Sequence, residues 1–349
     1  MFRRMVLLLA FFVILCACGN GKSGPYEVVF SMDGPPNSES ASITAVPAGK
    51  RYTIAIVPKG VEIPYFQYAA EGAREAGAEF GDEVIFEGPR NADAEEQIRI
   101  IEDLIDRKVD LLAVSANDPD KLVPVLRKAK QQGIRVITWD ADTEPPAREF
   151  FVNMVEPETL GRHLMDTMAM SMGESGEFAI LTGSLAAANL NEWLRWIRVQ
   201  HEEFYPNMKL LEVVPTDDDQ NKAYEEARRL LAEYPNLKGL LGNSSVGPPG
   251  AAKAVREAGK AGRVKVVGLS NPNLMAEYLR DDSAQMATLW SPKKLGYLTV
   301  VLAHRYLDGA KPADGQEIDK VGSIRVNGDM VIMGEPLDFT KDNVDQYDF

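Results

Sequence analysis

Residues 83–116 read EVIFEGPRNADAEEQIRIIEDLIDRKVDLLAVSA and contain the unit from which the fold can be inferred. The runs EVIFEG (83–88) and DLLAVSA (110–116) are short and rich in residues that favour β-strands. Between them, residues 94–107 carry apolar side chains three and four positions apart, which is typical of an amphipathic helix. A strand, a helix and a second strand of these lengths predict a βαβ unit with parallel strands.

The same alternation extends over residues 52–291. Helical stretches such as 219–234 separate the remaining strand-like runs, which are YTIAIVP (52–58), RVITWDAD (135–142), EFFVN (149–153), GEFAILTG (176–183), KLLEVVPT (209–216), LKGLLGN (237–243), VKVVGLS (264–270) and QMATLWS (285–291). These strands are too many for one doubly wound sheet, and the series starts again near residue 150, after Pro145-Pro146. We therefore predict an α/β fold with two doubly wound parallel-sheet lobes.

Composition and charge narrow the class of protein. The chain has 349 residues, of which 45% are hydrophobic and 26% charged, as in ordinary soluble globular proteins. Its 38 Lys plus Arg and 52 Asp plus Glu give a formal charge of −14, which argues against a nucleic-acid partner. Both cysteines lie within the first 18 residues, so the folded body has no disulfide, thiolate metal site or cysteine nucleophile.

The amino terminus predicts export. Residues 1–17 have the features of a signal peptide, with Arg3 and Arg4 followed by an apolar run too short to span a bilayer comfortably. The run ends in LCAC (15–18), which resembles a bacterial lipobox and predicts lipidation of Cys18. An ordinary signal peptide that contains cysteine is the alternative. Residues 18–50 then form a lipidated cysteine and a flexible tether, so we expect a protein in the periplasm or at the cell surface, membrane-anchored through Cys18 alone.

Polar and aromatic residues follow many of the predicted strands. Because ligands of parallel α/β sheets bind at the carboxyl ends of the strands, these residues are candidates for a shared cleft. Carboxylates, amides and hydroxyls suit the hydroxyl groups of a small polyhydroxylated ligand, and flat aromatics cover its apolar ring faces. An Asp or Asn at such a place is also a common helix cap, which is the alternative for each one. The candidates are Lys59, Asp140, Asn189, Asn243, Ser245, Ser270 and Trp290.

Four segments carry a resemblance to a known family. They are YTIAIVPKGVEIPYF (52–66), DLLAVSANDPD (110–120), GIRVITWDAD (133–142) and the ending DFTKDNVDQYDF (338–349). These segments resemble the periplasmic sugar-binding proteins of ABC importers, and most of all the branch that binds rhamnose and autoinducer-2. The resemblance implies two lobes joined by three crossovers, with the ligand between them. It suggests an N-terminal lobe of residues 51–145 plus about 291–315 and a C-terminal lobe of 146–290 plus about 316–349.

The resemblance also implies roles for single residues in the first lobe. Lys59 matches a ligand-contacting lysine of the autoinducer-2 branch, and Asp140 matches the aspartate that binds sugar hydroxyls across the wider family. Tyr65 and Phe66 match the aromatic pair that flanks the sugar ring in pentose-binding relatives. The alternatives are a solvated loop cation, or a charge paired with Asp140, for Lys59 and core packing for the two aromatics.

In the second lobe the resemblance implies ligand contacts for Asn189 and Asn243 and a hinge-side polar contact at Trp290 or Ser291. The chain also departs from its relatives here. Autoinducer-2 binders place Asp-Gln where this chain has Asn189-Leu190, and proline at the place of Asn243. Ribose binders follow the first-lobe aspartate with arginine, where this chain has alanine. A neutral sugar or polyol of another kind therefore fits better than either ligand.

The remaining motifs favour structural roles. The triplet Asp217-Asp218-Asp219 lacks the pattern of a calcium loop and precedes a helix, so we interpret it as an N-cap region. The three histidines are too far apart in the sequence to indicate a metal site, and we expect no cofactor. Trp193 and Trp196 share a helix, and one of them is expected in the core of the second lobe.

These features predict a solute-binding lipoprotein of an ABC importer, monomeric, with a sugar or polyol and the permease subunits as partners. A sensory receptor for a sugar-like signal such as autoinducer-2 would use the same cleft and is the alternative. A sugar-modifying enzyme with Lys59 and Asp140 as an acid–base pair is less favoured, because no nucleophile or paired-carboxylate motif accompanies them. We therefore expect no enzymatic activity.

Overall fold

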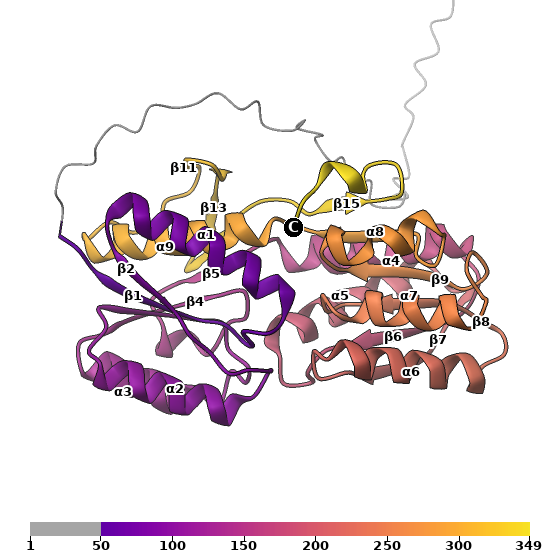
Figure 1. The fold of residues 1–349 in the computed structure, drawn as a ribbon, viewed down its shortest axis with the longest axis horizontal. Coiled ribbons are helices and arrows are strands. Elements are labelled where there is room, and N and C mark those ends of the chain that lie inside the picture. Colours follow the sequence, from indigo (N-terminus) through magenta and orange to yellow (C-terminus); the bar gives the residue numbers. More distant parts are fainter. Residues whose placement is uncertain (1–49) are drawn as a thin grey trace, which may run out of the picture.

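The computed structural model describes residues 50–349, which form two α/β lobes lying side by side (Figure 1). The predicted signal peptide, Cys18 and the tether up to residue 49 lie outside the described residues. Within residues 50–349, no helix combines the length and the apolar character needed to cross a bilayer.

The first lobe contains a seven-stranded sheet with the strand order β13-β14-β5-β4-β3-β1-β2. Its strands are β1 (Thr53–Val57), β2 (Glu83–Phe86), β3 (Leu111–Val114), β4 (Arg135–Trp139), β5 (Phe151–Asn153), β13 (Arg325–Asn327) and β14 (Met330–Ile332). Two pairs of helices cover its two faces (Figure 1): α1 (Pro64–Phe80) with α9 (Pro292–Leu307), and α2 (Ala94–Asp106) with α3 (Val123–Gln131). A small ribbon of β11 (Glu317–Ile318) and β12 (Gly322–Ser323) follows α9.

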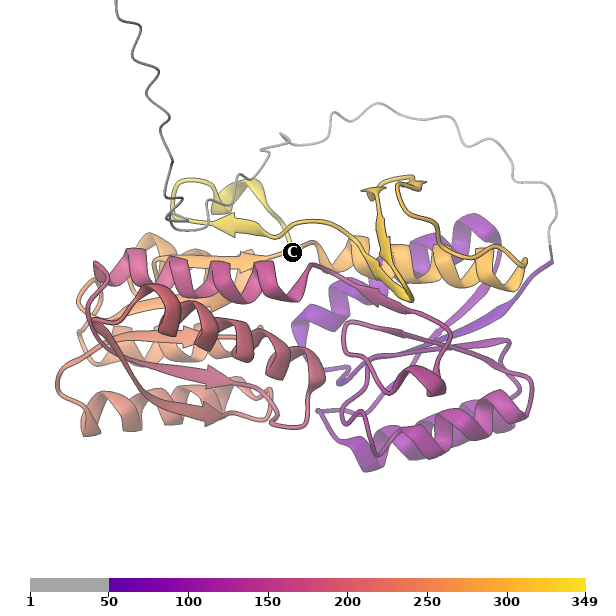
Figure 2. The same cartoon turned by 180° about the vertical axis from the view of Figure 1, so that it is seen from behind.

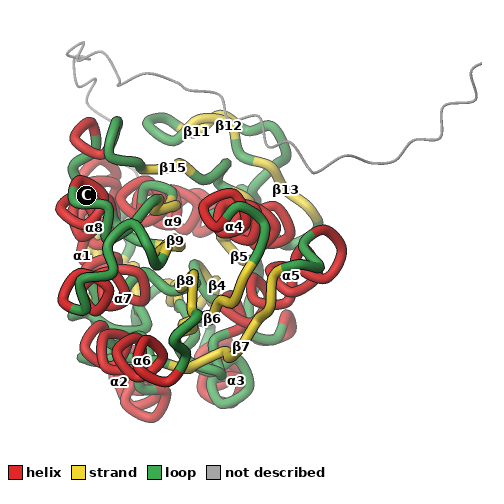
Figure 3. The backbone as a smooth tube through the Cα atoms, turned by 90° about the vertical axis from the view of Figure 1, so that its right-hand side faces the viewer, coloured by secondary structure: helices red, strands yellow, loops and turns green. Residues whose placement is uncertain are grey.

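The second lobe repeats this plan with a six-stranded sheet of order β15-β10-β9-β8-β6-β7. Its strands are β6 (Gly176–Thr182), β7 (Met208–Pro215), β8 (Leu237–Gly242), β9 (Lys265–Leu269), β10 (Met286–Leu289) and β15 (Leu337–Phe339). Helices α4 (Pro157–Met172) and α5 (Ala188–Phe204) cover one face (Figure 2). The other face carries α6 (Gln220–Glu233), α7 (Gly247–Glu257) and α8 (Pro272–Arg280), as the view along the molecule shows (Figure 3). The predicted fold class is confirmed.

Strand β1 shows why these sequences form a sheet buried on both faces. Ile54 and Ile56 belong to the core beneath α1 and α9, whereas Ala55 and Val57 belong to the core beneath α2 and α3. Successive side chains of a strand point to opposite faces, so a strand covered on both faces must be apolar at every position. The continuous apolar run TIAIV is the result.

The lobe boundaries differ from those expected from the sequence. Strand β5, expected at the start of the second lobe, pairs in parallel with β4 and β14 in the first sheet. The Pro145-Pro146 break forms a short 3-10 turn between β4 and β5 instead of a boundary. Residues 325–332 also join the first sheet, and within the segment 316–349 only β15 is a strand of the second sheet. The chain therefore crosses between the lobes after β5, after β10 and after β14, which gives the three crossovers that the resemblance implies.

Helices α1 and α9 approach each other backbone to backbone. A Cβ atom on Gly72 would lie 1.8 Å from the carbonyl oxygen of Lys293, and one on Gly296 would lie 1.9 Å from the carbonyl oxygen of Ala69. Glycine at both positions therefore allows an approach that any side chain would block. This contact matters for the region between the lobes, because α1 begins beside Tyr65 and α9 begins just after Trp290.

Candidate functional site

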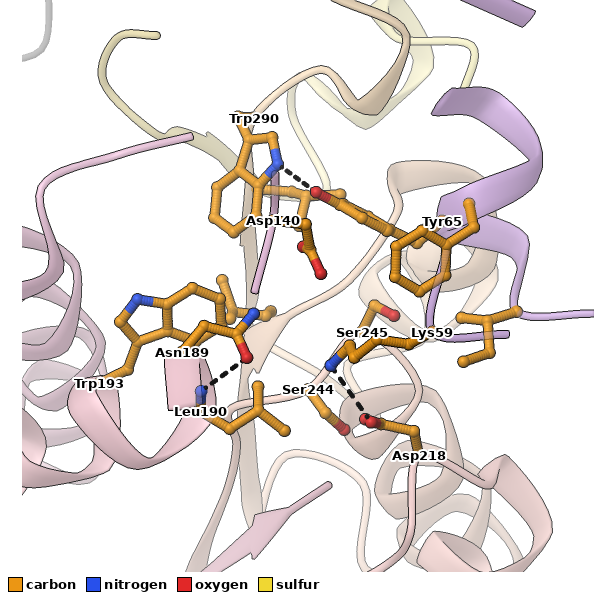
Figure 4. A pocket seen from close by; sticks show the side chains of 14 residues that line it. Lys59, Tyr65, Asp140, Asn189, Leu190, Trp193, Asp218, Ser244, Ser245 and Trp290 are labelled. Atoms are coloured by element: carbon orange, nitrogen blue, oxygen red, sulfur yellow. Dashed lines mark hydrogen bonds and ion pairs between the residues drawn. The ribbon is translucent and has the colours of Figure 1, made fainter. Parts of the chain in front are cut away.

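A cavity lies between the lobes, where the carboxyl ends of the two sheets face each other. Charged, amide and hydroxyl groups share it with aromatic and aliphatic side chains (Figure 4). Its lining residues are Lys59, Ile63, Tyr65, Phe66, Asp140, Asn189, Leu190, Trp193, Asp218, Ser244, Ser245, Leu269, Leu289 and Trp290.

Most of the residues predicted from the sequence line this cavity, namely Lys59, Tyr65, Phe66, Asp140, Asn189, Ser245 and Trp290. Asn243 and Ser270 are fully buried and are not among the lining residues. The side-chain nitrogen of Asn243 donates to the carbonyl oxygen of Leu190 at 2.9 Å, and the hydroxyl of Ser270 donates to the backbone carbonyl oxygen of Ser245 at 2.7 Å. Asn243 thus holds the first turn of α5 and Ser270 holds the loop of Ser245, and both of these segments line the cavity.

Asp140 follows β4, with φ of 60° in the left-handed region, and its side chain is directed into the cavity (Figure 4). The residue is 4% exposed, and the hydroxyl of Ser115 donates to its Oδ2 atom at 2.7 Å. Burial raises the pKa of the Asp140 carboxyl, while the ammonium group of Lys59 and hydrogen bonds from Ser115 and Tyr65 oppose the shift. The carboxyl is therefore a dehydrated acceptor that a ligand hydroxyl can reach.

Lys59 and Asp218 form an ion pair between the lobes, with 3.4 Å between Nζ and Oδ2. Lys59 follows β1 and Asp218 follows β7, and their side chains are 6% and 7% exposed. The sequence left two alternatives for Lys59 besides ligand contact, a solvated cation or a pair with Asp140. The structure buries it and pairs it with Asp218 instead. Because a buried charge without a partner is costly, each of these groups depends on the other when the lobes are closed.

Gln97, on the first turn of α2, ties two cavity loops together. Its Nε2 atom donates to the carbonyl oxygens of Pro58 at 2.9 Å and Ser115 at 2.8 Å. Its Oε1 atom accepts from the backbone N–H of Asn117 at 3.0 Å, and the Asn117 side chain donates to the carbonyl of Lys59 at 2.9 Å. One buried amide thus fixes the loop that presents Lys59 and the loop whose serine holds Asp140.

Aromatic side chains join the first lobe to the second crossover. The indole Nε1 of Trp290 donates to the hydroxyl oxygen of Tyr65 at 2.9 Å (Figure 4). Tyr65 packs edge-on against Phe66, with 5.0 Å between ring centroids, and Trp290 packs edge-on against Trp193 at 5.8 Å. Burial raises the pKa of Tyr65 well above its ordinary value, so its hydroxyl stays protonated and can donate towards Asp140.

Asp218 is the main lining residue that the sequence did not identify. Asp219 is the N-cap of α6, since its side chain accepts from the backbone N–H of Lys222 at 2.9 Å. Asp217 pairs with the Nζ atom of Lys222 at 2.5 Å. One carboxylate is enough to cap a helix. A run of three acids directly after a strand therefore contains two that the capping role does not explain, and this was the signal in the sequence for a further role. Asp218 turns into the cavity, with φ of 54°.

The two tryptophans of α5 have different surroundings. Trp193 is part of the core, as one of the pair was expected to be, and it also lines the cavity. Trp196 is outside the cavity, where the guanidinium carbon of Arg195 lies 4.0 Å from its ring centroid. The hydroxyl of Ser244, which also lines the cavity, has no hydrogen-bond partner among the described residues and is free to bind a ligand.

Within residues 50–349, no three His, Cys, Asp or Glu side chains are grouped closely enough to hold a metal ion. The charged groups that line the cavity are one ammonium and two carboxyls, from Lys59, Asp140 and Asp218. The ammonium group of Lys59 is already paired with Asp218, so an anionic ligand would find no free counter-charge among the lining residues. The cavity therefore disfavours an anionic ligand and offers hydrogen bonds to a neutral one.

The chain is similar to known proteins in sequence. Residues 54–311 match the model of the family described as periplasmic binding protein domain. The D-ribose/D-allose-binding protein of Pseudomonas aeruginosa is 30% identical over 65% of this chain and 73% of its own length. The ribose import binding protein of Salmonella typhimurium is 25% identical over 78% of this chain and 90% of its own length. Each of these relatives is named as a binding protein and not as an enzyme.

The chain is also similar to solved structures of solute-binding proteins. A solute-binding protein of an ABC transporter from Clostridium phytofermentas, with bound L-rhamnose, is 31% identical and has a TM-score of 0.81, covering 85% of this chain and 98% of that one. A solute-binding protein from Burkholderia graminis in complex with D-arabinose is also 31% identical, with a TM-score of 0.75 and the same coverage. The family match spans most of the chain. The chain therefore belongs to the periplasmic binding protein domain family, as its resemblance to sugar-binding proteins of ABC importers predicted.

Proposed function

We propose that this protein is the extracytoplasmic solute-binding lipoprotein of an ABC importer and binds a neutral sugar or related polyol between its lobes. The observation that carries the proposal is the cavity, in which Asp140, Lys59 and Asp218 are next to buried aromatic rings. Hydrogen-bonding groups and flat apolar faces together match the two surfaces of a sugar ring. The relatives named for ribose and allose and the structures with rhamnose and arabinose support this ligand class.

Binding would be coupled to closure of the lobes. A ligand that contacts both lobes stabilises the closed state by its difference in affinity for the closed and open states. Two contacts between the lobes belong to the closed state, the Lys59–Asp218 ion pair and a hydrogen bond from Asn273 on α8 to the hydroxyl of Tyr68 on α1, at 3.0 Å. Closure would thereby create the surface that the permease subunits recognise before the sugar is released to them.

The proposal includes export and anchoring of a monomer. The apolar run before Cys18 and the family of the body both support export, and the LCAC segment supports lipidation of Cys18. A Cys18→Ala variant should lose labelling by a radioactive fatty acid and leave the membrane fraction. Unchanged labelling and sedimentation of that variant would contradict the anchor.

A thermal-shift screen tests the ligand class. The purified chain is heated with pentoses, hexoses, deoxyhexoses, polyols and autoinducer-2, and its Tm is compared with that of the protein alone. A ligand at 100 times its Kd stabilises the native state by about 2.7 kcal/mol, which raises Tm measurably. We expect a rise with one sugar class. If no sugar or polyol raises Tm, and unfolding of the purified protein releases none detectable by mass spectrometry, the proposed function is wrong.

A further inference from the structure

One carboxylate oxygen joins three elements of the second lobe. The hydroxyl of Thr288 on β10 donates to Oδ1 of Asp338 on β15 at 2.7 Å, and Nε2 of His163 on α4 lies 2.8 Å from the same oxygen. Thr288 and Asp338 are opposite each other in the antiparallel pair of strands. Thr288 and His163 are buried, and hydrogen bonds in such an interior are stronger than in water. We call these three residues the crossover brace.

Each residue of the crossover brace belongs to an element next to a different crossover. Helix α4 is the first element after the first crossover, β10 is the last element before the second, and β15 is the first element after the third. His163 and Asp338 are 175 positions apart in the sequence. One hydrogen-bonded group thus ties together the second-lobe ends of all three crossovers.

The first-lobe ends of the crossovers are held by other bonds. The backbone N–H of Gly334 donates to the carbonyl oxygen of Met154 at 3.2 Å, so the first and third crossovers leave the first sheet side by side. The second crossover is held by the hydrogen bond from Trp290 to Tyr65 on α1. Bending between the lobes is therefore confined to the few residues between these bonds and the crossover brace.

The segments that remain have little backbone freedom. In the first and third crossovers they are residues 155–156 and 335–336. Each of the three crossovers also ends in a proline, at Pro157, Pro292 and Pro336. Proline fixes its own φ and restricts the residue before it to extended conformations. Because so few bonds can rotate, the path of closure depends on how the ends of the crossovers are held.

The core of the second lobe does not need polar groups at these places. Asp338 is the central residue of the strand LDF, and aspartate is disfavoured in strands. Apolar side chains of similar size avoid the cost of burying polar groups, and such replacements are often neutral or stabilising. Hydrogen bonds have a preferred direction, whereas apolar contacts do not. The crossover brace therefore supplies a fixed geometry that an apolar set would not.

We propose that Asp338 is a positioning residue of the hinge, which holds the three crossovers in one arrangement through Thr288 and His163 and so determines how the lobes meet. This inference rests on the closure of the lobes in the proposed function. It assigns no ligand contact to the crossover brace, since none of its residues lines the cavity. A looser hinge populates the binding-competent arrangement of the lobes less, and the apparent Kd rises in proportion.

Distances between spin labels in the ligand-free chain test the inference without knowledge of the sugar. Both cysteines of the sequence lie in its first 18 residues and are replaced by serine. Labels are then attached through Lys128→Cys on α3 and Arg228→Cys on α6, two exposed positions on different lobes. Pulsed electron paramagnetic resonance measures the distribution of distances between the two labels.

The test variant combines Thr288→Val, Asp338→Val and His163→Leu. We expect a Tm no lower than that of the unmodified chain and a broader distribution of label distances. With the sugar that raises Tm most in the thermal-shift screen, Kd should rise about 3- to 30-fold. Thr288→Val alone removes one bond from Asp338 and should broaden the distribution in the same direction, so it decides the matter if the triple variant does not fold.

Thr167→Val is the matched control. The hydroxyl of Thr167 is buried on α4 like the ring of His163, but it bonds to the carbonyl oxygen of Leu164 within the helix and reaches no crossover. The control should keep the distribution of the unmodified chain. A distribution as narrow as that of the unmodified chain in the folded test variant overturns the inference and leaves the proposed function standing. If the label distance in the unmodified chain does not change when that sugar is added, closure itself is contradicted and both fail.

Discussion

The ammonium nitrogen of Lys59 lies 3.4 Å from a carboxylate oxygen of Asp218, and this buried pair links two lobes whose sheets share no strand. The two residues are 159 positions apart in the sequence and meet where the strands β1 and β7 end. Because the pair joins the two lobes at one side of the cavity, its energy depends on whether the lobes are closed. It therefore connects the electrostatics of the site to ligand affinity.

Removing one partner of this pair should weaken ligand binding more than folding. In Asp218→Asn, Lys59 would remain buried without its counter-charge, a situation that costs about 3–5 kcal/mol in protein interiors. The open protein can hydrate Lys59, so the cost falls on closure. We expect Kd to rise at least 10-fold by calorimetry, with a small change in urea unfolding without ligand. The exposed pair Lys121–Glu95 is the control, and Glu95→Gln should leave Kd unchanged. Equal Kd values for Asp218→Asn and the unmodified protein would contradict this role.

Gln97 should act as a positioning residue. Gln97→Leu leaves two carbonyl oxygens and one N–H group without their partner, and each buried unpaired group costs about 1–3 kcal/mol. We expect a lower free energy of unfolding together with weaker sugar binding, because the loops of Lys59 and Ser115 lose their common support. Gln67→Leu on the exposed face of α1 is the matched control. To separate positioning from stability, affinity is measured at a temperature where each variant is fully folded. If the sugar affinity of Gln97→Leu is unchanged at that temperature, Gln97 contributes to the stability of the fold and does not position the binding loops.

Asp140 should make the ligand-free protein less stable as pH rises. Burial raises the pKa of this carboxyl above its ordinary value of 3.8, so the native state holds the proton at a pH where the unfolded chain has lost it. Its contribution to stability is therefore lost as pH rises through the raised pKa. Asparagine tolerates the left-handed backbone at this position and does not titrate. Calorimetry measures the Tm of Asp140→Asn minus the Tm of the unmodified protein, and this difference should increase from pH 4 to pH 7. A difference that decreases over this range would contradict the burial of a charged carboxylate.

Of the two tryptophans on α5, only Trp193 should change its fluorescence when the ligand binds. Trp193 lines the cavity and lies 5.8 Å from Trp290, whereas Trp196 is beneath Arg195 outside the cavity. The emission change on adding sugar should shrink by at least half in Trp193→Phe and persist in Trp196→Phe. If the Trp196→Phe variant loses the signal instead, the ligand binds somewhere other than this cavity.

Much of the fold could be predicted because strand and helix periods are local properties of the sequence. All ten strand-like runs correspond to β1–β10, and the apolar run of β1 follows from burial on both faces. The lobe boundary could not be predicted in this way. Strand β5 has three residues, and its place depends on pairing with β4 and with β14, which follows it by more than 170 positions. Such pairing is a tertiary property that no local pattern encodes.

The residues of the candidate site likewise include some that the sequence could predict and some that depend on tertiary structure. Residues directly after strands, such as Lys59 and Asp140, could be proposed because the carboxyl edge of a parallel sheet is a general place for ligands. The same rule could not separate Ser245, which lines the cavity, from Asn243, which is buried behind it. Asp218 was missed because a capping role explains acids before a helix equally well, and only the turn of the backbone at φ 54° directs this one into the cavity.

The most direct test of the central claim is a calorimetric titration of the sugar that gives the largest thermal shift into the unmodified protein and into Asp140→Asn. If a sugar binds between the lobes, the unmodified chain should bind one molecule per chain. Asp140→Asn, with an unchanged circular dichroism spectrum, should then bind at least 100-fold more weakly. Equal affinity of the two proteins would contradict the assignment of the cavity as the sugar site.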